Sequence, residues 1–278
     1  MAEGARAACV IGWPVKHSRS PLIHGYWIAQ HKLDAVYRSE EIAPEAFAGF
    51  LSHLASRGYA GANITIPHKE AALAMSEPDD RARAVGAANT LWYDNGRLHS
   101  TNTDVEGFTA NLDACVSGWE RRVGEAVVLG AGGSARAIVY GLIERGIGKI
   151  QVFNRTPERA EALQARFGPA IQPARASALP HLLSRAGLVV NTTSLGMAGQ
   201  PPLAIDLAPL PGHALVADLV YAPLETPLLA AARARGLATA DGLGMLLYQA
   251  VRGFQLWFGV RPEVTSQLRA LVETDLEK

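Results

Sequence analysis

The sequence predicts an α/β protein of two domains, an N-terminal α/β domain followed by a Rossmann-type doubly wound domain. At 278 residues the chain exceeds the usual size of a single domain. Short apolar runs alternate with helical segments along most of its length, which is typical of sheets with helical crossovers. The apolar run at residues 126–129 leads directly into a glycine turn at 130–135 and then into a helical pattern. This order of strand, turn and helix is that of a dinucleotide-binding unit.

The first hundred residues show the pattern of an α/β domain that ends in a hairpin. Pro21 suits the first turn of a helix, and Pro67 ends a strand. Asp94-Asn95-Gly96 separates two apolar runs as a hairpin turn does. We therefore expect strands at 7–11, 36–42, 60–65, 89–93 and 97–102, and helices from about residue 22 and over 44–57.

The remainder of the chain alternates regularly, as a parallel sheet requires. A domain boundary near residues 103–108 precedes the first helix of this part. The last two helical segments have no strand after them, so they could pack back on the first domain. The expected strands are 126–129, 150–153, 188–190 and 214–220, and the expected helices are 104–113, 157–167, 227–235, 242–258 and 263–273.

Composition excludes several classes of protein. Lysine and arginine together number 26, as do aspartate and glutamate. The chain therefore lacks the excess of basic residues that would indicate a nucleic-acid partner. No apolar run approaches the roughly 18 residues of a membrane span, and we expect a cytoplasmic protein. Cys9 and Cys115 are too few for a disulfide framework and are expected to be buried. The histidines form no metal-ligand pattern, so no metal is expected.

The glycine turn indicates a dinucleotide site, and the residues after the next strand indicate which dinucleotide. NAD-binding units place a carboxylate at the end of this strand to hold the ribose hydroxyl. Here the strand ends in Asn154-Arg155-Thr156, and Arg159 follows one helical turn later. Guanidinium groups can hold a 2′-phosphate through charge-assisted hydrogen bonds, which favours NADP(H). The alternative is that Thr156 caps a helix and both arginines are solvated.

Three segments of the first domain carry residues that could take part in catalysis or ligand binding. Lys69 follows a strand, where α/β sheets present ligand groups, although it could simply begin a helix. His68 beside it is expected to be solvated. Asp104 stands where the first domain ends and could act as a helix N-cap. Ser18 and Ser20 precede a helix whose N-terminus could bind a carboxylate.

Taken together, these segments resemble the shikimate dehydrogenase family, in order and over essentially the whole chain. The resemblance rests on motifs at 18–21, 61–69, 86–90, 102–104, 130–135, 154–156, 191–197, 218–221 and 241–249. It implies a split substrate domain, 1–106 completed by 242–278, and an NADP-binding domain, 107–241. It also implies reduction of 3-dehydroshikimate to shikimate with NADPH in aromatic amino-acid biosynthesis. The expected partners are small molecules only, and the expected state is a monomer or homodimer.

The resemblance also implies a role for each matching residue. Lys69 and Asp104 would be the catalytic pair. The substrate would be bound by Ser18, Ser20 and Tyr221 at its carboxylate and by Thr65, Asn89 and Gln249 at its ring hydroxyls. The cofactor would be bound by Gly130, Gly132, Gly133, Ser134 and Ala135 at the pyrophosphate, by Asn154, Arg155, Thr156 and Arg159 at the adenosine phosphate, and by Thr193, Leu219 and Gly242 beside the nicotinamide.

The catalytic pair suggests a mechanism, with one point left open. The carboxylate of Asp104 would keep Lys69 protonated, so that Lys69 polarises the carbonyl and delivers its proton. Asp104 could instead carry the proton. A dual-specificity quinate/shikimate dehydrogenase is the nearest alternative function, and a non-catalytic NADP(H)-binding sensor is the alternative from another class. Glutamyl-tRNA reductase has a similar cofactor unit, but neither cysteine here lies in a plausible active-site loop.

Overall fold

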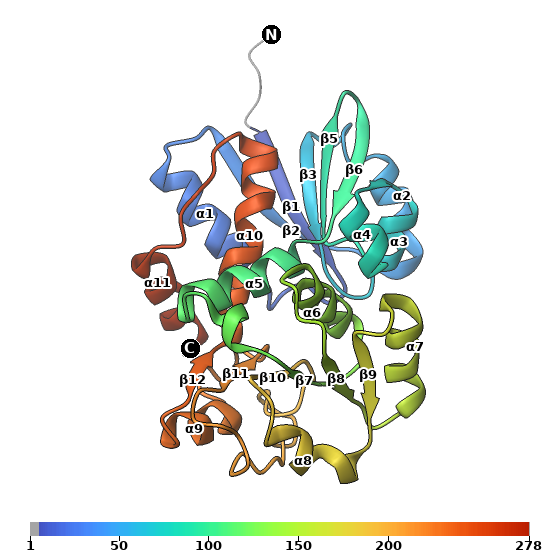
Figure 1. The fold of residues 1–278 in the computed structure, drawn as a ribbon. Helices are drawn as coiled ribbons and strands as arrows, with labels where there is room; N and C mark the ends of the chain where they lie inside the picture. The colour runs from blue at the N-terminus through green and yellow to red at the C-terminus, as the bar shows by residue number, and fades with distance from the viewer. Residues whose placement is uncertain (1–5, 278) are drawn as a thin grey trace. The chain divides into compact units, whose positions relative to one another are not determined.

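The computed structural model describes residues 6–277, which divide into two compact units (Figure 1). Unit 1 comprises residues up to Thr103 and from Gln249 onward, and unit 2 comprises Asp104–Tyr248. Both boundaries fall inside helices, α5 (Thr103–Cys115) and α10 (Gly242–Phe258). Each unit is built on its own six-stranded sheet, which confirms the predicted α/β class. None of the helices within residues 6–277 is long and apolar enough to cross a membrane.

Unit 1 holds a mixed sheet in the order β2-β1-β3-β5-β6-β4. The first three strands are parallel, and β5 returns antiparallel to β3 before the β5–β6 hairpin. Asn95 and Gly96 in the hairpin turn both have positive φ, 49° and 77°, as a two-residue type I′ turn requires. The strands are β1 (Arg6–Gly12), β2 (Ala35–Glu41), β3 (Tyr59–Ile64), β4 (Glu77–Pro78), β5 (Thr90–Asp94) and β6 (Arg97–Thr101).

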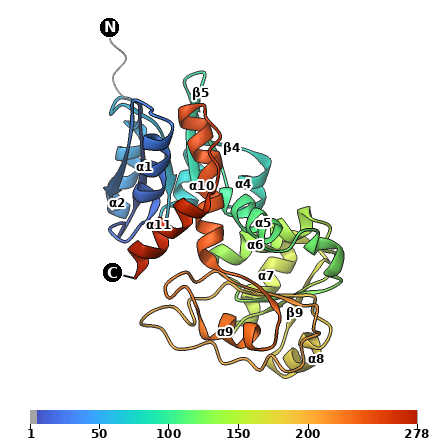
Figure 2. The same cartoon turned by 90° about the vertical axis from the view of Figure 1, so that its left-hand side faces the viewer.

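Helices cover both faces of this sheet. Alternate residues of β1, from Ala7 to Ile11, join Phe47 and Phe50 of the helix after β2 in one buried cluster. The other face lies under the first helix and the end of α10, and Figure 2 shows α1 and α11 side by side. The helices are α1 (Ser20–Gln30), α2 (Pro44–Ser52), α3 (Lys69–Ala74), α4 (Asp80–Val85) and α11 (Ser266–Leu276).

Unit 2 holds a wholly parallel sheet in the order β12-β11-β10-β7-β8-β9. After β7 the chain adds β8 and β9 on one side of that strand, and it later adds β10, β11 and β12 on the other side. The strands β7 and β10 therefore flank the topological switch point. The strands are β7 (Ala126–Leu129), β8 (Ile150–Phe153), β9 (Ile171–Ala174), β10 (Leu188–Asn191), β11 (Leu215–Asp218) and β12 (Ala238–Ala240).

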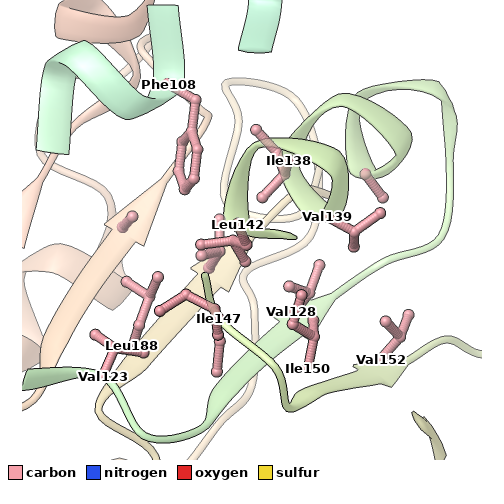
Figure 3. Close-up of a cluster of buried hydrophobic side chains, with 14 of the residues drawn as sticks. Phe108, Val123, Val128, Ile138, Val139, Leu142, Ile147, Ile150, Val152 and Leu188 are labelled. Atoms are coloured by element: carbon pink, nitrogen blue, oxygen red, sulfur yellow. The ribbon is translucent and has the colours of Figure 1, made fainter. Parts of the chain in front are cut away.

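Two apolar clusters sandwich the second sheet. On one face, Phe108 of α5 and Ile138 and Leu142 of α6 (Gly133–Glu144) pack over Val128 and Ile150, as Figure 3 shows. The helix α7 (Pro157–Phe167) adds to this face. The other face is covered by α8 (Leu179–Leu183) and α9 (Pro227–Ala234). Short 3-10 turns lie at Trp119–Arg122 and Ala176–Ala178. Helices on both faces make the unit doubly wound.

The long elements lie close to where the sequence predicts them, and the differences are mostly short elements. The helix 157–167 and the helix 242–258 are confirmed to the residue. The helix expected over 44–57 ends at Ser52 and continues as turns. Five short elements were not predicted: α4, α8, β4, β9 and β12, each six residues or fewer. The helix α3 does begin at Lys69, the position at which a helix start was predicted. Cys9 is buried as expected, but Cys115 is exposed, and the prediction that it is buried is wrong.

Candidate active site

The glycine turn of unit 2 lies at the switch point of its sheet. Gly130 directly follows β7 and has φ +106°, a conformation that favours glycine. A Cβ at this position would lie 2.6 Å from Thr192 Oγ1 and 2.9 Å from Thr193 Cγ2. The loop after β7 and the loop after β10 therefore approach too closely for any side chain at Gly130. Open α/β sheets bind their ligands at such a switch point, beside the carboxyl ends of the strands.

The next glycines of the turn face open space. A Cβ at Gly132, the residue before α6, would meet no protein atom within 4 Å. At Gly133 the nearest atom would be 3.9 Å away. The twelve-residue helix α6 begins at Gly133, and its first N–H groups have no intrahelical partner. Ser134 is exposed in its first turn, whereas Ala135 is fully buried beneath it. The turn thus combines an uncovered helix N-terminus with room for an anionic group.

Asn154 ties the glycine turn to the start of α7. Its Oδ1 accepts a hydrogen bond from the Ala131 N–H at 3.1 Å, and its Nδ2 donates to the Thr156 carbonyl at 2.8 Å. Arg155, Thr156 and Arg159 are all exposed around this point. Thr156 occupies the N-cap position of α7, but its side chain makes no capping hydrogen bond. Two guanidinium groups and a hydroxyl are therefore exposed to solvent where the chain leaves β8 and enters α7.

A buried pair of polar side chains organises the neighbouring strand ends. Asn191 ends β10 and Asp218 ends β11, and Asn191 Nδ2 donates to Asp218 Oδ1 at 2.9 Å. Asn191 Oδ1 accepts from both N and Oγ1 of Thr193, at 3.0 and 2.7 Å. Asp218 accepts from the Val220 N–H and from Thr226 Oγ1. Burial raises the pKa of Asp218 above its ordinary value, while these hydrogen bonds oppose the shift.

This pair fixes the loops that carry three of the expected site residues. Thr193, Leu219 and Tyr221 are each partly buried in the loops after β10 and β11. Gly242 begins α10 directly against one of these loops, since a Cβ there would lie 2.3 Å from the Leu219 carbonyl oxygen. The resemblance placed Asn191 and Asp218 within its motifs but gave them no role, and the structure identifies both as the anchors of these loops.

In unit 1, the expected substrate serines lie at the start of α1. Ser20 is the first residue of the helix and is buried, and its N–H donates to Ser18 Oγ at 3.3 Å. Arg19 between them forms an ion pair with Asp275 of α11 at 2.7 Å. The serine loop is thereby attached to the C-terminal helix of the same unit.

Lys69 is the first residue of α3 and follows a tightly held turn. The turn begins at Thr65, whose N–H donates to the Ile11 carbonyl at 2.9 Å. Gly12 permits this approach, because a Cβ there would lie 2.3 Å from Thr65 Cγ2. His68 is buried, with its ring stacked on Phe47 at 4.3 Å and its Nε2 2.7 Å from the Ile42 carbonyl oxygen. The prediction that His68 is solvated is therefore wrong.

Asn89 and Gln249 are brought together in unit 1 although they lie 160 positions apart in the sequence. Asn89 Oδ1 accepts from the Thr103 N–H at 2.7 Å and from Thr103 Oγ1 at 3.2 Å. Thr103 Oγ1 also lies 3.4 Å from Gln249 Oε1 on α10. All three side chains are buried. Thr103 thus joins two of the residues that the resemblance assigns to the substrate ring.

Asp104 is the second residue of α5, in its first turn. The helix begins one residue earlier, at Thr103, so the interpretation of Asp104 as its N-cap is wrong. A carboxylate in the first turn interacts favourably with the helix dipole. Among residues 6–277, no group of three or more histidine, cysteine, aspartate or glutamate side chains could hold a metal ion.

Comparison with known proteins identifies the family. Residues 10–91 match the shikimate dehydrogenase substrate binding domain, 119–197 match shikimate/quinate 5-dehydrogenase, and 242–271 match the shikimate 5′-dehydrogenase C-terminal domain. The chain is 66% identical over 271 residues to shikimate dehydrogenase (NADP(+)) of Nitrobacter winogradskyi, covering 98% of this chain and 97% of that protein. The chain belongs to the shikimate dehydrogenase family.

Solved structures of the family and its close neighbours share the fold. Shikimate 5-dehydrogenase from Thermus thermophilus, in complex with NADP(H) and shikimate, is 34% identical, with a TM-score of 0.84 and 98% of each chain covered. Quinate dehydrogenase from Corynebacterium glutamicum, in complex with NAD, is 32% identical, with a TM-score of 0.88, covering 97% of this chain and 99% of that one. This shikimate dehydrogenase family member therefore has structural counterparts with either cofactor.

Proposed function

We propose that this family member is an NADP-dependent shikimate dehydrogenase, which catalyses the reversible reduction of 3-dehydroshikimate to shikimate in aromatic amino-acid biosynthesis. The observation that carries the proposal is the 66% identity, over 98% of the chain, to a shikimate dehydrogenase (NADP(+)). The chemistry of the described residues supports it, because the chain carries the groups that this reaction needs: a lysine after a strand, a glycine turn before a helix, and two exposed arginines.

The residues of the glycine turn fit NADP(H). The open space at Gly132 and Gly133 and the N-terminus of α6 would take the pyrophosphate. Arg155 and Arg159, exposed next to Asn154 and Thr156, would hold the 2′-phosphate. Thr193, Leu219 and Gly242 would line the nicotinamide side. When bound, the cofactor supplies a hydride.

Unit 1 supplies most of the proposed substrate contacts. The hydroxyls of Ser18 and Ser20 at the start of α1, together with Tyr221 of unit 2, would bind the carboxylate. Thr65 would bind a ring hydroxyl, as would the paired Asn89 and Gln249. We assign substrate binding to residues 1–106 with 242–278 and cofactor binding to residues 107–241.

Lys69 and Asp104 are proposed as the catalytic pair. In the reductive direction the substrate carbonyl oxygen must gain a proton as hydride arrives, so a positioned acid lowers the barrier. The Lys69 ammonium would polarise this oxygen and donate the proton, and the Asp104 carboxylate would stabilise the ammonium. Asp104 as the proton carrier is the second form of the same mechanism.

A steady-state absorbance assay tests the function. Shikimate and quinate are each offered with NADP⁺ and with NAD⁺, and reduced nicotinamide is followed at its absorbance maximum. We expect the highest kcat/KM for shikimate with NADP⁺. An enzyme without activity on that pair would contradict the proposal.

Two alternatives give different results in the same assay. The likeness to a quinate dehydrogenase at a TM-score of 0.88 favours dual specificity as the second candidate, for which quinate turnover would approach that of shikimate. A non-catalytic NADP(H)-binding sensor would bind NADPH without turning over either substrate. A monomer or homodimer in the cytoplasm remains our expectation, and light scattering after size-exclusion chromatography distinguishes the two assemblies.

A further inference from the structure

A chain of buried hydrogen bonds in unit 1 leads from an edge strand to Asn89. Tyr37 on β2 donates from its hydroxyl to Asn63 Oδ1 at 2.6 Å. Asn63 Nδ2 in turn lies 3.2 Å from Thr90 Oγ1 and 3.3 Å from the Asn89 carbonyl oxygen. Thr90 Oγ1 lies 3.2 Å from Asn89 Oδ1 and 3.1 Å from Thr103 Oγ1. The four residues after Tyr37 are all buried, so each lost bond would leave a buried polar atom unsatisfied.

The sheet register explains how Tyr37 reaches Asn63 across the intervening strand. Ala8 of β1 pairs with Tyr37 on one side and with Gly61 on the other, and Val10 pairs with Asn63. Residues two apart on a strand point to the same face, so Tyr37 and Asn63 share a face of the sheet. The small side chain of Ala8 between them allows the tyrosine ring to cross β1.

The Tyr37 ring is fixed by other rings. It stacks on His24 of α1, with centroids 4.1 Å apart and planes at 15°, and Trp257 of α10 lies 5.9 Å away. Burial lowers the pKa of His24 to about 3, so this ring stays neutral at physiological pH. Burial also raises the pKa of Tyr37 well above its ordinary value, while the Ser20 hydroxyl interacts with it in the opposite sense. The Tyr37 hydroxyl therefore stays protonated at physiological pH and remains a hydrogen-bond donor.

The donor and acceptor roles along this series of hydrogen bonds follow from the donor at its start, the Tyr37 hydroxyl. Because Tyr37 donates to Asn63 Oδ1, the Asn63 amide must turn its Nδ2 toward Thr90 and Asn89. Thr90 then accepts from Asn63 and has its own proton for Asn89 Oδ1 or Thr103 Oγ1. Together with the Thr103 N–H, which donates to Asn89 Oδ1 at 2.7 Å, this hydroxyl holds the carboxamide oxygen of Asn89 toward the protein interior.

We propose that Tyr37 is a positioning residue for the reaction, acting through Asn63 and Thr90 to hold the Asn89 carboxamide in the orientation that binds a substrate hydroxyl. This inference rests on the proposed function, since it takes Asn89 as a substrate contact.

The test is the Tyr37→Phe variant, which keeps the ring in its stack and removes only the hydroxyl. We expect KM for shikimate to rise about five- to tenfold, as for one lost buried hydrogen bond, with KM for NADP⁺ unchanged. Tyr59→Phe is the matched control, because the Tyr59 hydroxyl donates to Glu40 in the same sheet and reaches no proposed substrate contact. Its KM values should equal those of the wild type.

A double-mutant cycle with Thr90→Val, which removes the hydroxyl and keeps the shape, tests whether Tyr37 acts through the chain. The combined increase in KM should be smaller than the product of the two single increases. An unchanged KM in Tyr37→Phe, a fully multiplicative cycle, or a loss of thermal stability without a change in KM would overturn the inference. The variants are compared with a wild-type enzyme that has measurable shikimate dehydrogenase activity. If the proposed function is wrong, the wild type itself is inactive, which distinguishes that failure from a failure of the inference about Tyr37.

Discussion

Lys69 is the side chain on which the proposed chemistry most depends. It begins α3 immediately after His68, whose ring is held by Phe47 and the Ile42 carbonyl. A positioned general acid contributes about 10²- to 10⁴-fold to rate, and the substrate is bound chiefly by other residues. In Lys69→Ala we therefore expect kcat for shikimate oxidation to fall at least about a hundredfold, while KM changes by less than about tenfold. Steady-state kinetics with NADP⁺ measures both constants.

Lys149→Ala is a suitable control for the loss of a lysine. Lys149 pairs with Glu125 at 3.1 Å, and it lies just before β8, at the end of that strand remote from the glycine turn. Its kcat should remain that of the wild type. Near-normal turnover in Lys69→Ala would remove Lys69 from the chemistry and leave Asp104 as the proton carrier to examine.

Arg155 should decide which nicotinamide cofactor is used. Its exposed guanidinium follows β8, where a carboxylate would favour NAD. A charge-assisted hydrogen bond contributes about 1.5 to 3 kcal/mol, so Arg155→Ser should raise KM for NADP⁺ about ten- to a hundredfold. KM for NAD⁺, which lacks the 2′-phosphate, should change little.

Arg166→Ala controls for a general loss of positive charge. This arginine is exposed in the last turn of the same helix, α7. Its cofactor constants should match the wild type. If Arg155→Ser raised KM for NAD⁺ as much as for NADP⁺, the 2′-phosphate would not be the group that Arg155 holds.

Two positions of the glycine turn, Gly130 and Gly132, should respond to an alanine substitution in opposite ways. At Gly130, φ is +106° and a Cβ would collide with Thr192 and Thr193, so Gly130→Ala should lower the midpoint of thermal unfolding without ligand. At Gly132 a Cβ meets no protein atom, so Gly132→Ala should leave that midpoint unchanged. The added methyl group would instead occupy the space assigned to the pyrophosphate and raise KM for NADP⁺ at least about tenfold, equivalent to roughly 1.4 kcal/mol.

Differential scanning fluorimetry and cofactor titrations separate these effects. Gly148→Ala, also with open space around the added Cβ, should change neither the unfolding midpoint nor KM. An unaltered KM for NADP⁺ in Gly132→Ala would show that the pyrophosphate does not lie against the turn.

How far the sequence predicts each element depends on how local its signal is. The glycine turn and the β5–β6 hairpin were predicted because their signals lie within a few consecutive residues. The environment of His68 was predicted wrongly, because its burial depends on Phe47, 21 residues earlier in the chain. The crowding of Gly130 by Thr192 and Thr193 and the Asn191–Asp218 pair arise only when β7, β10 and β11 align.

The series of hydrogen bonds from Tyr37 to Asn89 could not be predicted from the sequence either, because it joins residues that are far apart along the chain. Tyr37, Asn63 and Thr90 belong to three different strands, and only the register of the sheet places them in contact. Periodicity shows that a strand is present but does not fix its partners. Short elements such as β4, of two residues, carry too few positions for any periodicity.

Stability of the molecule toward acid should depend on one buried carboxylate. Glu125 is 5% exposed and accepts from Gln151 at 2.9 Å, with Arg185 and Lys149 within ion-pair distance. Burial alone raises its pKa, but the hydrogen bonds from Arg185, Lys149 and Gln151 outweigh burial, and the pKa of Glu125 lies below its ordinary value of 4.5. A depressed carboxyl pKa stabilises the folded state above the pKa of the unfolded chain, and this contribution is lost as pH falls through the folded value.

Glu125→Gln tests this contribution through chemical unfolding at several pH values. At pH 7 the variant should be about 1 to 3 kcal/mol less stable, because it leaves partly buried cations unpaired. As pH falls through the folded pKa of Glu125 the difference should shrink, since the wild-type carboxyl is then protonated as well. Glu158→Gln, exposed in the first turn of α7, is the control and should show a much smaller difference. A deficit independent of pH would assign the effect to packing instead of charge.

The division of unit 1 into two stretches of sequence constrains how this protein is made. The rings of His24, Trp27 and Tyr37 pack against Phe254 and Trp257, which come from beyond the whole of unit 2. A ribosome therefore synthesises 145 intervening residues, Asp104–Tyr248, before the rings that complete this core exist. Domains generally fold as units during synthesis. Unit 2 can complete its own core first, whereas the nascent first sheet keeps part of one apolar face uncovered until the end of α10 emerges.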